Sequence, residues 1–190
     1  IISRMTINEI VSGGITLEDS KTIAKILEDA GVDILNTSVG LGETYHYVIP
    51  PMALPQGCYV EMVGEIKKKV KIPVIAVGRI NDPMLAEKIL LEEKADLVEM
   101  GRALIADPEL PKKAKQGKLK EIRRCVGCNE CVRHTRSDFP IICTLNPTVG
   151  REKECRIVPV RKPRRVLVVG GGPAGMEAAT IAALKGLEDS

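Results

Sequence analysis

The feature that most constrains the fold is an alternation of short apolar strands with helical segments in the first 117 residues. Unbroken, mostly apolar runs occur at residues 1–5, 32–36, 74–77 and 96–100. Strands that are apolar along their whole length are typical of a parallel sheet covered on both faces, with helices as the connections. The alternation therefore predicts an α/β fold built on a parallel sheet.

The segments between these runs carry helix signals. Thr16 and Asp19 resemble a capping box, and apolar residues then recur at helical spacing until Gly31. The same reasoning predicts further helical segments at 59–70, 83–93, 103–108, about 109–117 and 119–124. A Gly- and Pro-rich stretch from Thr37 to about Cys58 is predicted as a loop, and loops of that length are usually functional or disordered.

Two Gly-Arg pairs, Gly78-Arg79 and Gly101-Arg102, follow consecutive predicted strands. Glycine lets a ligand oxygen approach the backbone amides, and arginine offers a two-pronged donor to phosphate. One such pair would be an ordinary turn glycine beside a surface arginine. Two pairs at successive strand ends favour a phosphate site, and the short helix predicted at 103–108 could add its N-terminal dipole.

Four cysteines have the spacing of metal ligands. They are three thiols at two-residue gaps and one more distant, namely Cys125, Cys128, Cys131 and Cys143. Structural zinc normally uses two separated pairs, whereas three crowded ligands and a remote fourth resemble the pattern of a four-iron cluster. The sequence favours a [4Fe-4S] site, with zinc or unrelated thiols as alternatives, and Cys58 and Cys155 lie outside the pattern.

A second domain begins near residue 165. Residues 151–164 are rich in charge and proline, as in a linker, and 165–169 read as a strand before a predicted helix at 175–185. The loop between that strand and helix has the Gly-x-Gly-x-x-Gly spacing of a dinucleotide site, formed by Gly170, Gly172, Pro173, Ala174 and Gly175. No second strand is apparent to carry the acidic residue that would hold a ribose, so these residues leave FAD and NAD both open.

Composition excludes several classes of function. Net charge is only +3 over 190 residues, and the chain has no Trp, one Phe and three Tyr. The basic runs at 112–124 and 151–165 therefore lack the aromatic residues that stack on nucleic-acid bases, and we expect no nucleic-acid partner. No apolar run reaches the about 18 residues of a membrane span, so we expect no membrane association. Cysteines with ligand spacing fit a reducing, cytoplasmic setting.

Together these motifs resemble the iron–sulfur flavoenzymes of the old yellow enzyme superfamily, such as 2,4-dienoyl-CoA reductase, 2-enoate reductase and trimethylamine dehydrogenase. The segments that carry the resemblance are 77–83, 101–108, 125–143 and 168–175. It implies that residues 1–117 form the C-terminal half (strands five to eight) of an FMN-binding (β/α)8 TIM barrel. Residues 118–150 would hold the cluster, 151–164 a linker, and 165–190 the truncated start of a Rossmann-like FAD/NAD(P)-binding domain. Both ends look cut, so we expect a piece of a longer polypeptide.

The resemblance also implies roles for individual residues. The FMN phosphate would be held by Gly78, Arg79, Gly101 and Arg102, with Arg4 near flavin N1 and O2. The cluster ligands would be Cys125, Cys128, Cys131 and Cys143. FAD would contact Gly170, Gly172, Pro173, Ala174 and Gly175. Tyr45 and His46 could contact substrate or relay a proton, or be plain loop residues. The family's tyrosine acid would lie in the half of the barrel that precedes Ile1.

The activity implied is an NAD(P)H-dependent reduction of an activated C=C bond in a small enoate or enoyl thioester. Electrons would pass from NAD(P)H to FAD, through the [4Fe-4S] cluster to FMN, and on to substrate. The alternatives are amine oxidation of the trimethylamine dehydrogenase type, or an electron-transfer or interaction module that is inactive without the missing half-barrel. The sequence sets no oligomeric state.

Overall fold

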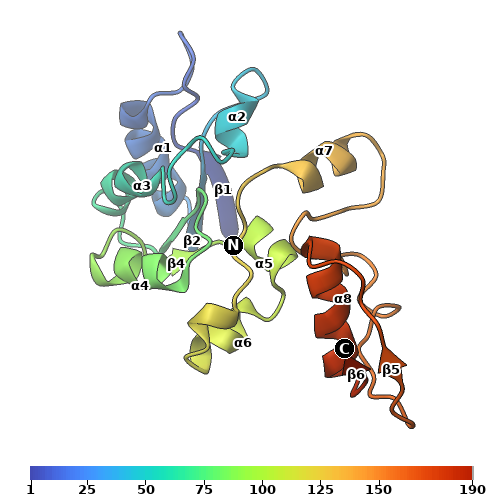
Figure 1. The fold of residues 1–190 in the computed structure, drawn as a ribbon. Helices are drawn as coiled ribbons and strands as arrows, with labels where there is room; N and C mark the ends of the chain where they lie inside the picture. Colours follow the sequence, from blue (N-terminus) through green and yellow to red (C-terminus); the bar gives the residue numbers. More distant parts are fainter. Residues whose placement is uncertain (190) are drawn as a thin grey trace. The chain divides into compact units, whose positions relative to one another are not determined.

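A four-stranded parallel sheet lies at the centre of the first part of the chain in the computed structural model, which describes residues 1–189 (Figure 1). The strands are in sequence order: β1 (Ile2–Thr6), β2 (Ile34–Ser38), β3 (Val74–Ala76) and β4 (Leu97–Val98). Arg4 pairs in register with Asn36, and Asn36 with Ile75. All three pairings are parallel, as the alternation in the sequence predicts.

Helices connect the strands, as a parallel sheet requires. The crossover helices are α1 (Leu17–Asp29), α3 (Val60–Lys67) and α4 (Pro83–Leu91), and Figure 1 shows them on the same side of the strands. Shorter elements are α2 (Tyr45–Val48), α5 (Arg102–Ala106), α6 (Leu110–Lys115), the 3-10 turn η1 (Leu119–Glu121) and α7 (Glu130–Arg136). None of the helices within residues 1–189 is long and apolar enough to cross a bilayer.

The two faces of the sheet differ in burial. Because side chains alternate along a strand, Met5, Leu35 and Val74 point to one face, where they are buried against the crossover helices. Arg4 and Asn36 point to the other face, which is only partly covered. The hydrophobic core therefore lies between the sheet and α1, α3 and α4, and the opposite face carries polar groups.

The local signal at Thr16 places the start of α1 correctly. The capping box at α1 is present in both directions, with the Asp19 amide donating to Thr16 Oγ1 at 3.3 Å and the Thr16 amide donating to Asp19 Oδ2 at 3.0 Å. The predicted strand at 32–36 was placed two residues too early. The Val32 amide donates to the Leu27 carbonyl at 3.1 Å, so Val32 still belongs to the turn that ends α1.

The chain divides into two compact units, Ile1–Val149 and a second that starts at Gly150. The second unit contains β5 (Arg165–Val166), α8 (Pro173–Leu184) and β6 (Glu188–Asp189), with β5 and β6 paired in parallel. The prediction that no strand follows the glycine loop was therefore wrong. β6 is a two-residue charged strand, and a pattern of apolar residues cannot reveal such an element.

Candidate cofactor site

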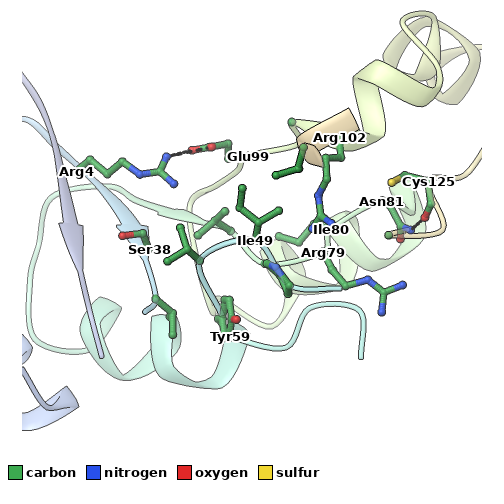
Figure 2. Close-up of a pocket in the computed structure, with 18 residues that line it drawn as sticks. Arg4, Ser38, Ile49, Tyr59, Arg79, Ile80, Asn81, Glu99, Arg102 and Cys125 are labelled. Carbon is green, nitrogen blue, oxygen red and sulfur yellow. Dashed lines mark hydrogen bonds and ion pairs between the residues drawn. The ribbon is translucent and has the colours of Figure 1, made fainter. Parts of the chain in front are cut away.

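A cavity of about 270 Å³ opens at the carboxyl ends of the four strands (Figure 2). Each strand supplies part of its wall: Arg4 from β1, Ser38 from β2, the segment 77–81 after β3 and residues 99, 101 and 102 after β4. In parallel α/β folds, ligands bind at this end of the strands. The structure thus brings Arg4 and both predicted Gly-Arg pairs to one pocket, which we call the strand-end pocket.

Gly78 is required by a neighbouring aromatic ring. Its φ of +116° lies in a region that side chains rarely adopt, and a Cβ there would lie 2.6 Å from Cδ2 of Tyr59. Tyr59 is buried and donates to the Tyr47 carbonyl at 2.6 Å. Burial raises the pKa of the Tyr59 phenol, so it stays a neutral donor. Gly78 therefore lets this ring close one wall of the pocket.

Gly101 and Asn81 leave space and an unused acceptor for a ligand. A Cβ on Gly101 would meet nothing within 4 Å, so the backbone there is open to a close-fitting group. Asn81 Oδ1 is buried without a hydrogen-bond partner among the described residues, while its Nδ2 donates to the Cys125 carbonyl. An orphaned buried acceptor is costly unless a ligand or water donor satisfies it.

The Arg79 guanidinium is hydrogen-bonded to backbone carbonyls of the protein. Its Nη1 donates to the carbonyl of Met52 at 3.1 Å and to that of Leu54, and its Nη2 to the carbonyl of Val126 at 3.4 Å. The guanidinium therefore holds the loop around residue 52 against the cysteine segment. Binding of phosphate by Arg79 stays a prediction, and these contacts direct its charge to carbonyl oxygens instead.

Arg4 faces an acidic residue that the sequence analysis missed. Its Nη1 lies 3.1 Å from both carboxylate oxygens of Glu99 (Figure 2). Asn36 Nδ2 also donates to Glu99 Oε2, at 2.6 Å. The available signal was an acid inside the mostly apolar run 96–100, two residues before Gly101. The pocket thus contains a paired positive and negative charge on its strand wall.

Tyr45 and His46 do not line the strand-end pocket. They begin the one-turn helix α2, whose later residue Val48 does line it. The Arg136 guanidinium carbon lies 4.2 Å from the centre of the Tyr45 ring, a cation–π contact, and His46 is exposed. A role for either side chain in proton transfer stays a prediction that this arrangement does not support.

The four patterned cysteines line one small cavity, which we call the cysteine cavity: Cys125, Cys128, Cys131 and Cys143. Burial raises the pKa of the Cys131 thiol, the nearby Cys125 and Cys128 add to this rise, and Arg102 opposes it. The Leu145 amide lies 3.5 Å from Cys143 Sγ as a donor. Within residues 1–189, no group of three or more His, Cys, Asp or Glu side chains is arranged to hold a single metal ion.

Side-chain amides fix the ends of the cysteine segment. Asn146 is buried, donates to the Ile105 carbonyl at 2.8 Å and accepts from the Thr148 amide at 3.1 Å. Cys125, near the other end, is held through its carbonyl by Asn81. α7 lies between these anchors and was not predicted, because its seven residues are mostly polar and show no apolar period.

In the second unit, the glycine loop has the geometry of a dinucleotide turn. Gly170 has a φ of +109°, and a Cβ on Gly175 would overlap the Gly170 carbonyl oxygen. A Cβ on Gly172, directly before α8, would meet nothing within 4 Å, and Pro173 and Ala174 form the first turn of that helix. These features match the turn, the close approach and the helix packing expected of this motif. Binding of FAD stays a prediction.

Comparison with known proteins identifies a family whose match lies within the first unit. Residues 1–121 match the NADH:flavin oxidoreductase / NADH oxidase family. The chain is 50% identical over 188 residues to the NADH oxidase of Thermoanaerobacter brockii, and the match covers 96% of this chain and 29% of that protein.

Two solved structures are also similar. A 2-naphthoyl-CoA reductase in complex with 2-naphthoyl-CoA superposes with a TM-score of 0.91 at 36% identity, covering 98% of this chain and 29% of that one. Histamine dehydrogenase from Rhizobium sp. 4-9 gives a TM-score of 0.88 at 28% identity, covering 99% and 28%. The chain spans less than a third of the length of these relatives. On the match over residues 1–121, the chain belongs to the NADH:flavin oxidoreductase / NADH oxidase family.

Proposed function

We propose that this chain is part of an NAD(P)H-dependent flavin and iron–sulfur oxidoreductase that reduces an activated C=C bond. One observation carries the proposal: Arg102 and Cys125 line both the strand-end pocket and the cysteine cavity. Two cofactors in these sites would be near neighbours, as electron transfer between them needs. When bound, flavin and cluster supply the one- and two-electron chemistry that connects a nicotinamide to a substrate.

The strand-end pocket fits FMN. Gly101 leaves room for a phosphate close to the backbone, and Arg102 adds a positive charge on the same wall. The orphaned Asn81 Oδ1 offers an acceptor to a ligand N–H or O–H. Arg4 is the cation available to stabilise negative charge on a reduced flavin ring. Gly78 would contribute backbone without a side chain to the pocket wall. Arg79 would contribute by holding the loop around residue 52 in place.

The cysteine cavity fits a [4Fe-4S] cluster better than a zinc ion. Structural zinc normally takes two separated pairs of ligands, whereas three of these cysteines are spaced two residues apart and the fourth is remote. A cube of four irons takes one thiolate at each of four separated corners, so its ligands need only surround a common space. Cys125, Cys128, Cys131 and Cys143 do surround one.

The exposed edges and the uncovered face of the sheet support a half-barrel as the fold of the first unit. Ile2 and Leu97 are 62% and 44% exposed, on the outermost strands of the parallel sheet, and one face lacks a helical cover. Parallel sheets are normally buried on both faces, and a closed barrel achieves this. Residues 1–117 would then be the C-terminal half of a (β/α)8 barrel, 118–150 the cluster segment, 151–164 a linker and 165–190 the start of an FAD- and NAD(P)-binding domain.

A small enoate or enoyl thioester is the proposed substrate class, supported by the likeness to a reductase of an aromatic acyl-CoA. Amine oxidation is the second candidate, favoured by the likeness to histamine dehydrogenase. The third candidate is that residues 1–190 alone act as an electron-transfer or interaction module, without enzymatic activity in the absence of the other half-barrel. We place the whole enzyme in the cytoplasm, because its four patterned thiols need a reducing setting.

The test uses the full-length protein purified without oxygen. We expect bound FMN and FAD, about four irons and four sulfides per chain, and oxidation of NADH or NADPH that depends on an enoate or enoyl thioester. Turnover with methylated amines and an electron acceptor, but not with enoates, would favour the second candidate. One zinc per chain without sulfide would end the electron-transfer proposal.

A further inference from the structure

Asn129 lies between the cysteine ligands proposed for the cluster, yet its side chain bonds to two residues that line the strand-end pocket. It follows Cys128 directly, precedes Cys131 by two residues and has a φ of +62° at the start of α7. This left-handed backbone is one that Asn and Gly adopt at low cost. The side chain is therefore placed by the path of the cysteine loop.

The amide of Asn129 bridges two walls of the strand-end pocket. Its Oδ1 accepts from Nη1 of Arg102, and its Nδ2 donates to the Ile49 carbonyl at 3.1 Å. Arg102 and Ile49 both line that pocket (Figure 2), and they come from segments 53 residues apart in the chain (102 minus 49). Asn129 itself lines the cysteine cavity. One side chain thus connects the two sites.

Further contacts connect the cysteine loop to the segments that line the strand-end pocket. The Met52 amide donates to the Gly127 carbonyl at 2.9 Å, and Arg79 donates to the Val126 carbonyl at 3.4 Å. A Cβ on Gly127 would lie 3.1 Å from Nε of Arg79, so the loops approach closely. A bound cluster that ordered the cysteine loop would through these contacts also fix the loop that carries Ile49 and the direction of Arg102.

We propose that Asn129 is a positioning residue that couples occupancy of the cysteine cavity to flavin affinity in the strand-end pocket. This inference rests on the proposed function. A cluster on Cys128 and Cys131 would hold the Asn129 amide in place and so aim Arg102 at the flavin phosphate. Because coupling between two sites is reciprocal, bound flavin would also slow loss of the cluster.

The test measures FMN dissociation constants by flavin fluorescence, in full-length protein with its cluster intact and after the iron has been removed with a chelator. For the wild type we expect affinity to fall by about 10-fold or more on cluster removal, within the usual 5- to 150-fold range of such coupling. In Asn129→Gly, which keeps the left-handed backbone and loses the amide, the ratio of the two constants should approach 1.

Two further variants separate positioning from a general structural role. Asn129→Asp keeps an acceptor for Arg102 and loses the donor to Ile49, so it should retain most of the ratio. Arg133→Ala removes an exposed pair with Glu130 (2.8 Å) on the same helix and should leave the ratio unchanged.

An Asn129→Gly protein with the wild-type ratio would overturn the inference, and so would equal weakening of FMN binding in both cluster states. In either case flavin and sulfide in the wild type would leave the proposed function standing. A wild-type protein that lacks flavin or sulfide would instead refute the proposed function and the coupling together.

Discussion

The glycine loop of the second unit and the strand-end pocket of the first are both candidate nucleotide sites, but they are built differently. The glycine loop is local, since Gly175 meets the carbonyl of Gly170, five residues earlier. The pocket depends on contacts between distant segments: Arg4 reaches Glu99 across 95 residues, and Asn129 reaches Ile49 across 80.

The difference shows which residues determine the geometry of each kind of site. A local turn needs only residues without side chains at fixed spacing, so its geometry follows from the motif. A pocket between strand ends needs charged and amide side chains held by the whole sheet, and few of those partners are visible as a motif. Variants in the two regions should therefore differ in whether they lose flavin affinity or folding stability.

The largest effect is expected for Gly175→Ala. The added methyl would overlap the Gly170 carbonyl oxygen, and backbone cannot move aside as a flexible side chain can. We expect FAD affinity of the full-length protein to fall at least about 1,000-fold, equivalent to about 4 kcal/mol. Flavin content after gel filtration would measure it.

The matched control is Gly171→Ala in the same loop. A Cβ there meets nothing within 4 Å, and its φ lies outside the positive region. This variant should retain FAD within about threefold. Equal loss of FAD in both variants would show that the loop tolerates no side chain anywhere, and the local packing explanation would be wrong.

In the first unit, Gly78→Ala and Gly101→Ala should separate stability from binding. At Gly78 the methyl would meet the Tyr59 ring at 2.6 Å on a backbone with positive φ, so we expect a loss of about 3 kcal/mol in the free energy of unfolding.

At Gly101 the methyl enters open pocket space, so stability should hold while FMN affinity falls about 10-fold, or about 1.4 kcal/mol. Urea unfolding and flavin titration of both variants give the comparison.

Sequence patterns predicted those parts of the structure that local rules govern. The order of parallel strands, the capping box at Thr16 and the glycine turn at Gly170 all agree with the structure. β6 and α7 were missed because short polar elements leave no hydrophobic period. Glu99, Asn81 and Asn129 were missed because an amide or a carboxylate gains its role only from partners that folding brings close.

Arg79 gives the next test, of a long-range contact. Arg79→Lys keeps the charge but cannot reach the carbonyls of Met52, Leu54 and Val126 together, since a lysine ends in one compact ammonium. We expect a loss of about 2 kcal/mol, seen as a lower urea midpoint and faster proteolysis in the loop near Met52. Arg133→Lys, an exposed pair on α7, should change stability by less than about 0.5 kcal/mol. A midpoint for Arg79→Lys equal to that control would rule out the clamp.

The smallest effect concerns the charge pair in the pocket. Glu99→Gln keeps an acceptor for Arg4 and Asn36 but removes a negative charge from the wall. Arg4 would then act on a bound flavin without compensation and favour its anionic reduced form, so the two-electron reduction potential should rise by on the order of 20–30 mV, about 1 kcal/mol. Glu92→Gln, just after α4, makes the same change in net charge outside the pocket and should leave the potential unchanged. Spectroelectrochemical titration of both variants decides the matter, because a potential that stays fixed or falls in Glu99→Gln would mean that Glu99 does not oppose Arg4 at the flavin.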